Sequence, residues 1–185
     1  MHPTAIDNAT KFVSKYGKYL FELAGQRMPP EIGKAPRQAK VLDVGSYDVN
    51  GTLRPIFKNF NYCGTDIVKG PGVDVVSKNG NLCFADNSFD LAVSSSCMEH
   101  DAVFWVTFLE MVRVVRPGGL IYLCVPSSGP EHHRPDRWRF LSGAYDALAD
   151  WSAEVSLIES YIDQRGTWKD AVGVFRVNGD RHANL

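Results

Sequence analysis

The stretch V-L-D-V-G-S-Y-D-V-N-G, residues 41–51, constrains the fold of this chain more than any other. An apolar run that ends in an acid and glycines is typical of a buried strand entering a ligand-binding turn. We expect a strand over residues 40–44 with Asp43 at its carboxyl end. Gly45 then lets the backbone approach a ligand at a place where any side chain would obstruct it.

A second acid stands at the end of the next predicted strand, residues 62–67, about fifteen residues beyond Gly51. In an open α/β sheet an acid at this position, here Asp66, hydrogen-bonds the hydroxyls of a ribose. A dinucleotide pyrophosphate needs the turn G-x-G-x-x-G, but Tyr47 occupies the second glycine position and Asp48 follows it. The two strands therefore predict a nucleoside-containing cofactor and a turn that would receive a phosphate poorly.

Length and composition indicate an ordinary globular protein with a small-molecule ligand. The chain has 185 residues, 44% hydrophobic and 22% charged, and its formal net charge of −1 offers no general attraction to nucleic acid. It shows no apolar run of about eighteen residues and no secretion signal, so we expect a cytoplasmic protein without a membrane partner. The sequence is compatible with a homodimer. The cysteines lack C-x-x-C spacing and are expected to be reduced and structural: Cys63, Cys83, Cys97 and Cys124.

The order of the remaining segments predicts an α/β domain. Residues 5–26 have helical apolar spacing, and a linker rich in proline follows over 28–39, so the predicted units are 1–39 and 40–185. Helices are expected over 52–59, from 101 to about 115 and over 141–151, and strands over 73–76, 89–96 and 120–125. Residues 116–119, Arg-Pro-Gly-Gly, are expected to end the second of these helices. An antiparallel hairpin of 154–162 and 171–177 completes the chain.

Several motifs resemble one enzyme family. The turn after the first strand resembles motif I, D/E-x-G-x-G-x-G, of the class I S-adenosylmethionine-dependent methyltransferases, with Asp43 and Gly45 in place and Tyr47 departing from the second glycine. N-S-F-D-L at 87–91, C-M-E-H at 97–100 and E-M-V-R-V-V-R-P-G-G at 110–119 resemble the S-F-D-x-V, L-E-H and E-x-x-R-V-L-K-P-G-G patterns of methyltransferase type 11 proteins. H-R-P-D-R-W-R-F at 133–140 is similar to their H-x-P-D-x-W/Y-R-F signature. The resemblance covers residues 40–177.

This resemblance implies a fold and a cofactor. The fold would be Rossmann-like and doubly wound, a mostly parallel seven-stranded sheet with an antiparallel C-terminal strand. The cofactor would be S-adenosylmethionine, whose cationic sulfonium suits an acid-rich turn better than a dinucleotide does. The residues expected to bind it are Asp43, Gly45, Ser46, Tyr47, Asp66, Ile67, Asn81, Leu82, Ser95 and Ser96.

Catalytic residues are harder to predict, because holding the methyl group in line with its acceptor supplies much of the acceleration. A hydroxyl acceptor usually needs a general base, and histidine suits that task at neutral pH. His132 and His133, on the loop after the fifth strand, are the candidates, although they could instead only brace the loop. Asp136 and Arg137 either bind the substrate or belong to an internal ion pair. No metal-binding spacing is evident, and His100 is expected to be structural.

The sequence thus predicts an S-adenosylmethionine-dependent methyltransferase that acts on a small polar acceptor, a hydroxyl of a sugar or natural product. A non-catalytic partner subunit of the same fold is the first alternative. An NAD(P)-dependent oxidoreductase is the second, disfavoured by Tyr47 and by the absence of a Tyr-x-x-x-Lys motif. Tyr16 and Tyr19 of the N-terminal helix either close over the site or pack against the domain.

Overall fold

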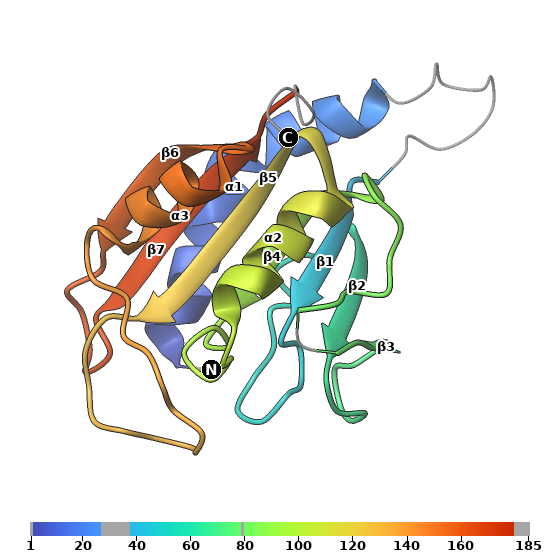
Figure 1. The fold of residues 1–185 in the computed structure, drawn as a ribbon. Helices are drawn as coiled ribbons and strands as arrows, with labels where there is room; N and C mark the ends of the chain where they lie inside the picture. The colour runs from blue at the N-terminus through green and yellow to red at the C-terminus, as the bar shows by residue number, and fades with distance from the viewer. Residues whose placement is uncertain (1, 27–37, 79, 180–185) are drawn as a thin grey trace.

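The computed structural model describes residues 2–26, 38–78 and 80–179 (Figure 1). Most of the linker expected over residues 28–39 lies outside the described residues, and so do the last six residues of the chain. None of the helices in the described part combines the length and apolar character that crossing a bilayer requires.

Within the described residues, seven strands form a single sheet in the order β3-β2-β1-β4-β5-β7-β6. Neighbouring strands from β3 to β5 are parallel, whereas β7 is antiparallel to both β5 and β6. The predicted mostly parallel sheet with an antiparallel C-terminal strand is therefore confirmed. The strands are β1 Lys40–Val44, β2 Asn61–Asp66, β3 Val75–Val76, β4 Phe89–Ser95, β5 Val115–Pro126, β6 Val155–Ile162 and β7 Asp170–Val177.

Helices cover both faces of the sheet, as expected of a doubly wound domain. The helix α1, Pro3–Gly25, lies on one face, and α2, Phe104–Val114, and α3, Ala144–Ser152, lie on the other (Figure 1). Neighbouring residues of the central strands face the two cores: Val41 belongs to the core under α1, and Leu42 belongs to the core under α2. The central strand β4 is buried along its whole length, and its apolar residues Phe89, Leu91, Ala92 and Val93 contribute to both cores.

The two tyrosines of α1 join this helix to the sheet. The Tyr16 hydroxyl donates to the Glu159 carboxylate at 2.7 Å, and the Tyr19 hydroxyl donates to the Gly118 carbonyl at 2.6 Å. Lys15 also pairs with Glu159 at 2.8 Å. Neither tyrosine lines the large cavity described below, so both pack against the domain rather than close over a site.

Two predictions of secondary structure were wrong. Residues 52–59 form no α-helix but tight turns, in which the amide of Ile56 donates to the carbonyl of Leu53 at 2.9 Å. The Phe57 side chain is fully buried, so these turns contribute a large apolar residue to the core without forming a helix. Residues 116–119 do not end α2 but belong to β5, because Pro117 biases the preceding Arg116 toward extended backbone.

Candidate functional site

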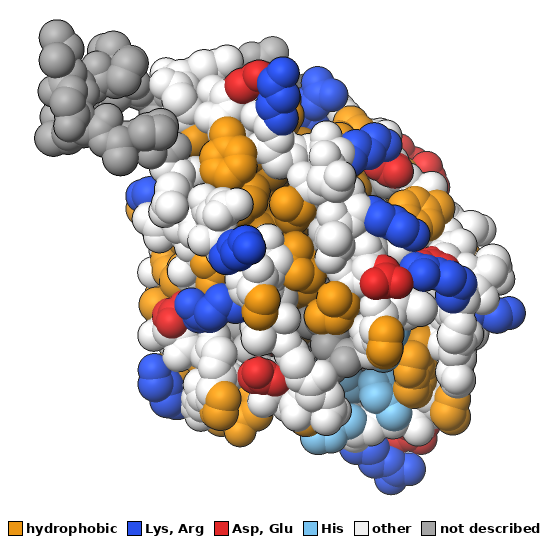
Figure 2. Space-filling model, turned by 180° about the vertical axis from the view of Figure 1, so that it is seen from behind, with side chains coloured by type: hydrophobic (Ala, Val, Ile, Leu, Met, Phe, Trp, Pro, Cys, Tyr) orange, Lys and Arg blue, Asp and Glu red, His pale blue; other side chains and the backbone are white. Residues whose placement is uncertain are grey.

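A cavity of about 1010 Å³ lies at the carboxyl ends of the parallel strands. The loops after β1 and β5 both leave the end of the sheet to which the arrowheads of β1 and β5 point, and both contribute lining residues (Figure 1). The strand order reverses between β1 and β4, and ligands of open α/β sheets bind at such a switch point. Histidine side chains gather at one end of the molecular surface (Figure 2).

Most of the residues expected at the site line this cavity. They are Asp43, Gly45, Ser46, Tyr47, Asp66, Ile67, Leu82, Ser95, Ser96, His132, His133 and Arg137. Asn81 is exposed and does not line the cavity, nor does Asp136. The fold therefore brings together residues from the ends of β1, β2, β4 and β5.

The turn after β1 requires glycine for a reason that the sequence does not reveal. Gly45 has a φ of +84°, and a Cβ built on it would lie 2.3 Å from the Sγ of Cys97. Its amide donates to the carbonyl of Thr65 at 2.9 Å, which ties the turn to the end of β2. A protein neighbour, Cys97, thus occupies the space that was expected to be kept open for a ligand.

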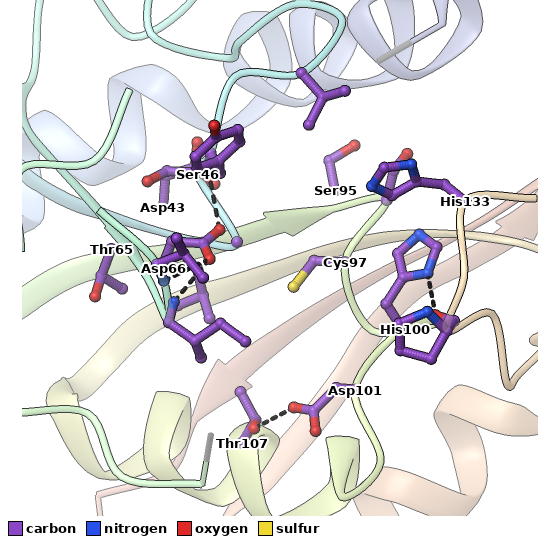
Figure 3. Close-up of a pocket in the computed structure, with 18 of the residues that line it drawn as sticks. Asp43, Ser46, Thr65, Asp66, Ser95, Cys97, His100, Asp101, Thr107 and His133 are labelled. Carbon is purple, nitrogen blue, oxygen red and sulfur yellow. Dashed lines mark hydrogen bonds between the residues drawn. The ribbon is translucent and has the colours of Figure 1, made fainter. Parts of the chain in front are cut away.

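Asp66 ends β2 and is held across the turn by backbone amides. Its Oδ2 accepts from the Tyr47 amide at 3.1 Å, and its Oδ1 accepts from the Ile67 amide at 2.7 Å (Figure 3). Oδ1 also accepts from the Val68 amide at 3.3 Å, so the remaining lone-pair capacity of the carboxylate lies on Oδ2. The carboxylate is therefore pre-oriented and still able to accept hydrogen bonds from a ligand in the cavity.

Asp43 is a buried acid next to this turn, with 3% of its surface exposed. Burial raises the pKa of Asp43 to about 7, and the nearby Asp66 also raises it. The hydrogen bond donated by the Tyr62 hydroxyl and the charge of Arg54 act in the opposite direction. Asp43 thus titrates near neutral pH when the cavity holds no ligand.

This raised pKa predicts a dependence of stability on pH. Because the native carboxyl keeps its proton between pH 4 and 7 while the unfolded one releases it, stability falls as pH rises through this window. From pH 5 to pH 8 the native protein should lose on the order of 2 kcal/mol of unfolding free energy through this group. The Asp43→Asn variant has no carboxyl to titrate at this position, so it should not show this loss. Urea unfolding of both proteins at the two pH values measures the difference. Tyr62→Phe keeps the titrating carboxyl and should retain the pH dependence. An Asp43→Asn variant with the same pH profile as the native protein would contradict the assignment.

Glu110 and Arg113, from the motif at residues 110–119, hold one wall of the cavity in place. The Arg113 guanidinium donates to the carbonyls of Leu82 and Phe84, both at 2.8 Å. The Glu110 carboxylate accepts from the Leu82 amide at 2.8 Å and pairs with Arg113 at 2.7 Å. These two side chains therefore fix the position of Leu82, which lines the cavity.

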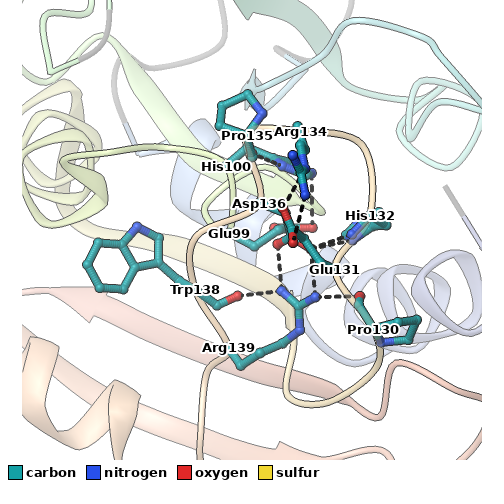
Figure 4. A network of polar contacts seen from close by, with 10 residues as sticks. All are labelled: Glu99, His100, Pro130, Glu131, His132, Arg134, Pro135, Asp136, Trp138 and Arg139. Carbon is teal, nitrogen blue, oxygen red and sulfur yellow. Dashed lines mark hydrogen bonds and ion pairs between the residues drawn. The ribbon is translucent and has the colours of Figure 1, made fainter.

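The opposite wall is the loop after β5, residues 127–143, where Asp136 organises the polar contacts (Figure 4). Its Oδ2 lies 2.8 Å from the Nδ1 of His132, and the Arg139 guanidinium donates to both of its oxygens at 2.6 and 2.7 Å. The hydrogen bonds from Arg139 hold the pKa of Asp136 well below its usual range. Asp136 thus belongs to an internal ion pair, whereas the neighbouring Arg137 lines the cavity.

Glu99 and His100 follow β4 and lie beside this loop. Glu99 is fully buried, and burial raises the pKa of its carboxyl to about 8. The Nδ1 of His100 lies 2.6 Å from the Pro135 carbonyl, and burial lowers the pKa of this imidazole. His100 lines the cavity, although the sequence suggested only a structural role. The resemblance at C-M-E-H was the available signal, but nothing in the sequence placed it beside His132.

Several other lining residues were not predicted, among them two aromatic ones. His2 comes from the start of α1, and Trp168 precedes β7; the Trp168 and His132 rings lie 4.4 Å apart between their centroids. Both reach the cavity only through packing of distant segments, and no motif marks either of them. All four cysteines are free, and Cys83 is exposed rather than buried.

Comparisons with known proteins agree with this arrangement. Residues 53–123 match the family model Methyltransf_11, described as a methyltransferase domain. An uncharacterized methyltransferase of Mycobacterium marinum is 46% identical over 54 residues, 29% of this chain and 21% of that protein. One from Mycobacterium leprae is 34% identical over 71 residues, 38% of this chain and 26% of that protein. The matched segments thus span only about a quarter or less of these relatives.

Solved structures extend the likeness across the fold. The S-adenosylmethionine-dependent methyltransferase from Methanosarcina mazei has a TM-score of 0.60 and 15% identity, covering 79% of this chain and 95% of that one. The 1,6-didemethyltoxoflavin-N1-methyltransferase of Burkholderia thailandensis, solved with S-adenosylhomocysteine, has a TM-score of 0.61 and 16% identity, covering 95% and 88%. At these identities the likeness concerns the fold. Residues 53–123 therefore resemble a methyltransferase type 11 domain, and the described part of the chain has the class I S-adenosylmethionine-dependent methyltransferase fold.

Proposed function

We propose that this protein is an S-adenosylmethionine-dependent methyltransferase that methylates a hydroxyl of a small polar acceptor, such as a sugar or natural product. The observation that carries the proposal is the pre-oriented Asp66 carboxylate at the tip of β2, which lines the same cavity as the turn after β1. An acid at this place serves ribose hydroxyls, and the switch point supplies the crevice.

The polar atoms of the cavity support this cofactor. The hydroxyls of Ser46 and Ser96 are buried and have no hydrogen-bond partner in another described residue, although both residues line the cavity. Buried polar groups normally have partners, so these two hydroxyls suit a polar ligand. Ser96 also has a φ of +53°, a costly conformation for a residue other than glycine that is often found at binding sites.

The residues divide the cavity between two ligands. Asp66 would hold the ribose, Leu82 would contact the adenine, and Ser46 and Ser96 would hydrogen-bond the amino-acid end of the cofactor. When bound, S-adenosylmethionine supplies an electrophilic methyl group on a sulfonium leaving group. The acceptor would then lie against the loop after β5, with Arg137 binding its polar groups.

The acceptor hydroxyl must lose its proton as its oxygen bonds to the methyl carbon, and the loop histidines are the groups we propose to take it. His133 lines the cavity, and its imidazole makes no hydrogen bond within the part of the chain that the structure describes (Figure 3). His132 has its Nδ1 held by Asp136, which leaves its Nε2 as the second candidate. His133 is therefore the first choice for the base.

Calorimetric titration of the purified chain with S-adenosylhomocysteine, beside NAD⁺ and NADP⁺, tests the cofactor. Binding of S-adenosylhomocysteine alone is expected, and preference for a dinucleotide would favour the oxidoreductase instead. Incubation with methyl-labelled S-adenosylmethionine and a panel of sugars and phenolic natural products then tests the acceptor class. Cofactor binding without label transfer to any hydroxyl, nitrogen or carbon acceptor would favour the non-catalytic partner subunit.

Asp66→Ala is expected to weaken S-adenosylhomocysteine binding by about 1.5 to 3 kcal/mol, because hydrogen bonds to a charged group are lost. Asp66→Asn keeps the side-chain size and one acceptor oxygen, so it should lose less. The control is Asp48→Ala, which removes an acid of the same turn that does not line the cavity. Calorimetric affinity equal to that of the native protein in Asp66→Ala would remove Asp66 from the site.

A further inference from the structure

Three potential metal ligands meet at the wall of the cavity opposite Asp66. Glu99, His100 and His132 each offer one ligand atom, and these atoms all lie within 4.8 Å of one another (Figure 4). Glu99 and His100 follow β4, whereas His132 lies on the loop after β5. Because the fold rather than the sequence brings them together, the spacing of the histidines predicted no metal site.

Each histidine is oriented as a metal ligand usually is. The Nδ1 of His100 faces the Pro135 carbonyl at 2.6 Å, and the Nδ1 of His132 faces the Asp136 carboxylate at 2.8 Å. A carbonyl or carboxylate oxygen only accepts, so Nδ1 carries the proton in the neutral form of both rings, and Nε2 of that form has a lone pair for a metal ion. Metal-binding histidines typically have this support from a carbonyl or carboxylate. Arg139 holds Asp136 in place in turn.

The environment of Glu99 independently indicates a bound cation. Its side chain is fully buried, and neither carboxylate oxygen has a hydrogen-bond partner in another described residue. One of these oxygens lies 3.7 Å from the Nε2 of His100. The main chain of Glu99 is firmly placed, because its carbonyl accepts from the amides of Arg137 and Trp138 at 2.7 and 3.2 Å. Ionising a buried acid that has no partners is costly, and a bound cation would compensate the charge of its carboxylate.

We propose that Glu99, His100 and His132 bind one divalent transition-metal ion of the zinc class. Two imidazole nitrogens and one carboxylate oxygen form a ligand set of catalytic zinc sites, which keep a further position for water or substrate. Imidazole ligands disfavour Mg²⁺ and Ca²⁺, which prefer oxygen. His100 and His132 line the cavity, so the remaining position faces the acceptor side. The proposed metal site rests on these three ligands and does not depend on the proposed methyl transfer.

Metal binding to the full chain tests the proposal directly. The protein, made without a histidine tag and stripped with a chelator, is titrated with Zn²⁺ by calorimetry and with Co²⁺ by visible absorption. One equivalent of Zn²⁺ and the absorption of low-symmetry, nitrogen- and oxygen-bound Co²⁺ are expected. Absence of stoichiometric binding, or Mg²⁺ binding of similar affinity, would overturn the site. S-adenosylhomocysteine binding, measured separately, reports on the proposed function alone.

Variants identify the ligands. Glu99→Gln, His100→Gln and His132→Gln should each weaken Zn²⁺ binding by at least a hundredfold, more than loss of an outer partner usually does. His133→Gln is the matched control, because His133 neighbours His132 but is not one of the three ligands, and its affinity should not change. Equal weakening in His133→Gln would overturn the assignment. If a variant fails to fold, X-ray absorption of the Zn²⁺-loaded native protein decides: two imidazoles with oxygen support the site, and sulfur from Cys97 refutes it.

Discussion

Gly45→Val is expected to destabilise the protein by about 3 to 5 kcal/mol, through a left-handed backbone that valine resists and a collision in the core. The φ of +84° at this position strains any side chain, and the new Cβ would meet the Sγ of Cys97 at 2.3 Å. For a chain of this size the loss corresponds to a drop in melting temperature on the order of 10 °C. Thermal and urea unfolding measure it.

The same substitution should weaken S-adenosylhomocysteine binding at least tenfold, because Gly45 links the turn that carries Tyr47 to the end of β2. Gly143→Val is the matched control, since a Cβ at Gly143 would meet nothing within 4 Å and its φ is −90°. The control should stay within about 1 kcal/mol of the native stability. A Gly45→Val protein with native stability and affinity would show that the turn neither needs glycine nor holds the cofactor.

His133→Gln is expected to lower kcat by about a hundredfold or more once an acceptor hydroxyl is known, because a general base contributes rate factors of that order. The affinity for S-adenosylhomocysteine should stay unchanged, since His133 lies on the acceptor side of the cavity, away from Asp66 (Figure 3). Single-turnover transfer of a labelled methyl group, with calorimetry of the same preparation, separates the two effects.

The control for this prediction is Glu131→Gln on the same loop. Glu131 pairs with Arg134 at 2.8 Å near the surface and does not line the cavity, so kcat should be close to native. If His133→Gln retains full turnover while the control does as well, proximity of methyl group and acceptor alone explains the rate. If both variants lose activity equally, the loop conformation rather than a proton acceptor is responsible.

The sequence by itself determined the parts of the protein that depend on local pattern. Short, mostly apolar segments marked the buried strands β1 and β4, and the final order of strand, turn and strand marked the antiparallel hairpin of β6 and β7. Asp66 and Gly45 could be placed because the carboxyl ends of parallel strands meet at one edge. The secondary-structure prediction was wrong at two places. Residues 52–59 form turns instead of a helix, and Arg116 belongs to β5 instead of ending α2.

Only the tertiary structure decided which side chains share the acceptor wall. Glu99 and His132 are 33 residues apart in the sequence, and His2 and Trp168 come from opposite ends of the chain. Their meeting depends on how the loop after β5 packs against the segment after β4, a contact that carries no sequence periodicity. The contact between Gly45 and Cys97 also depends on long-range packing, because Cys97 lies in the segment after β4. Long-range packing, rather than spacing along the chain, therefore set the burial, hydrogen bonds and charge of the site.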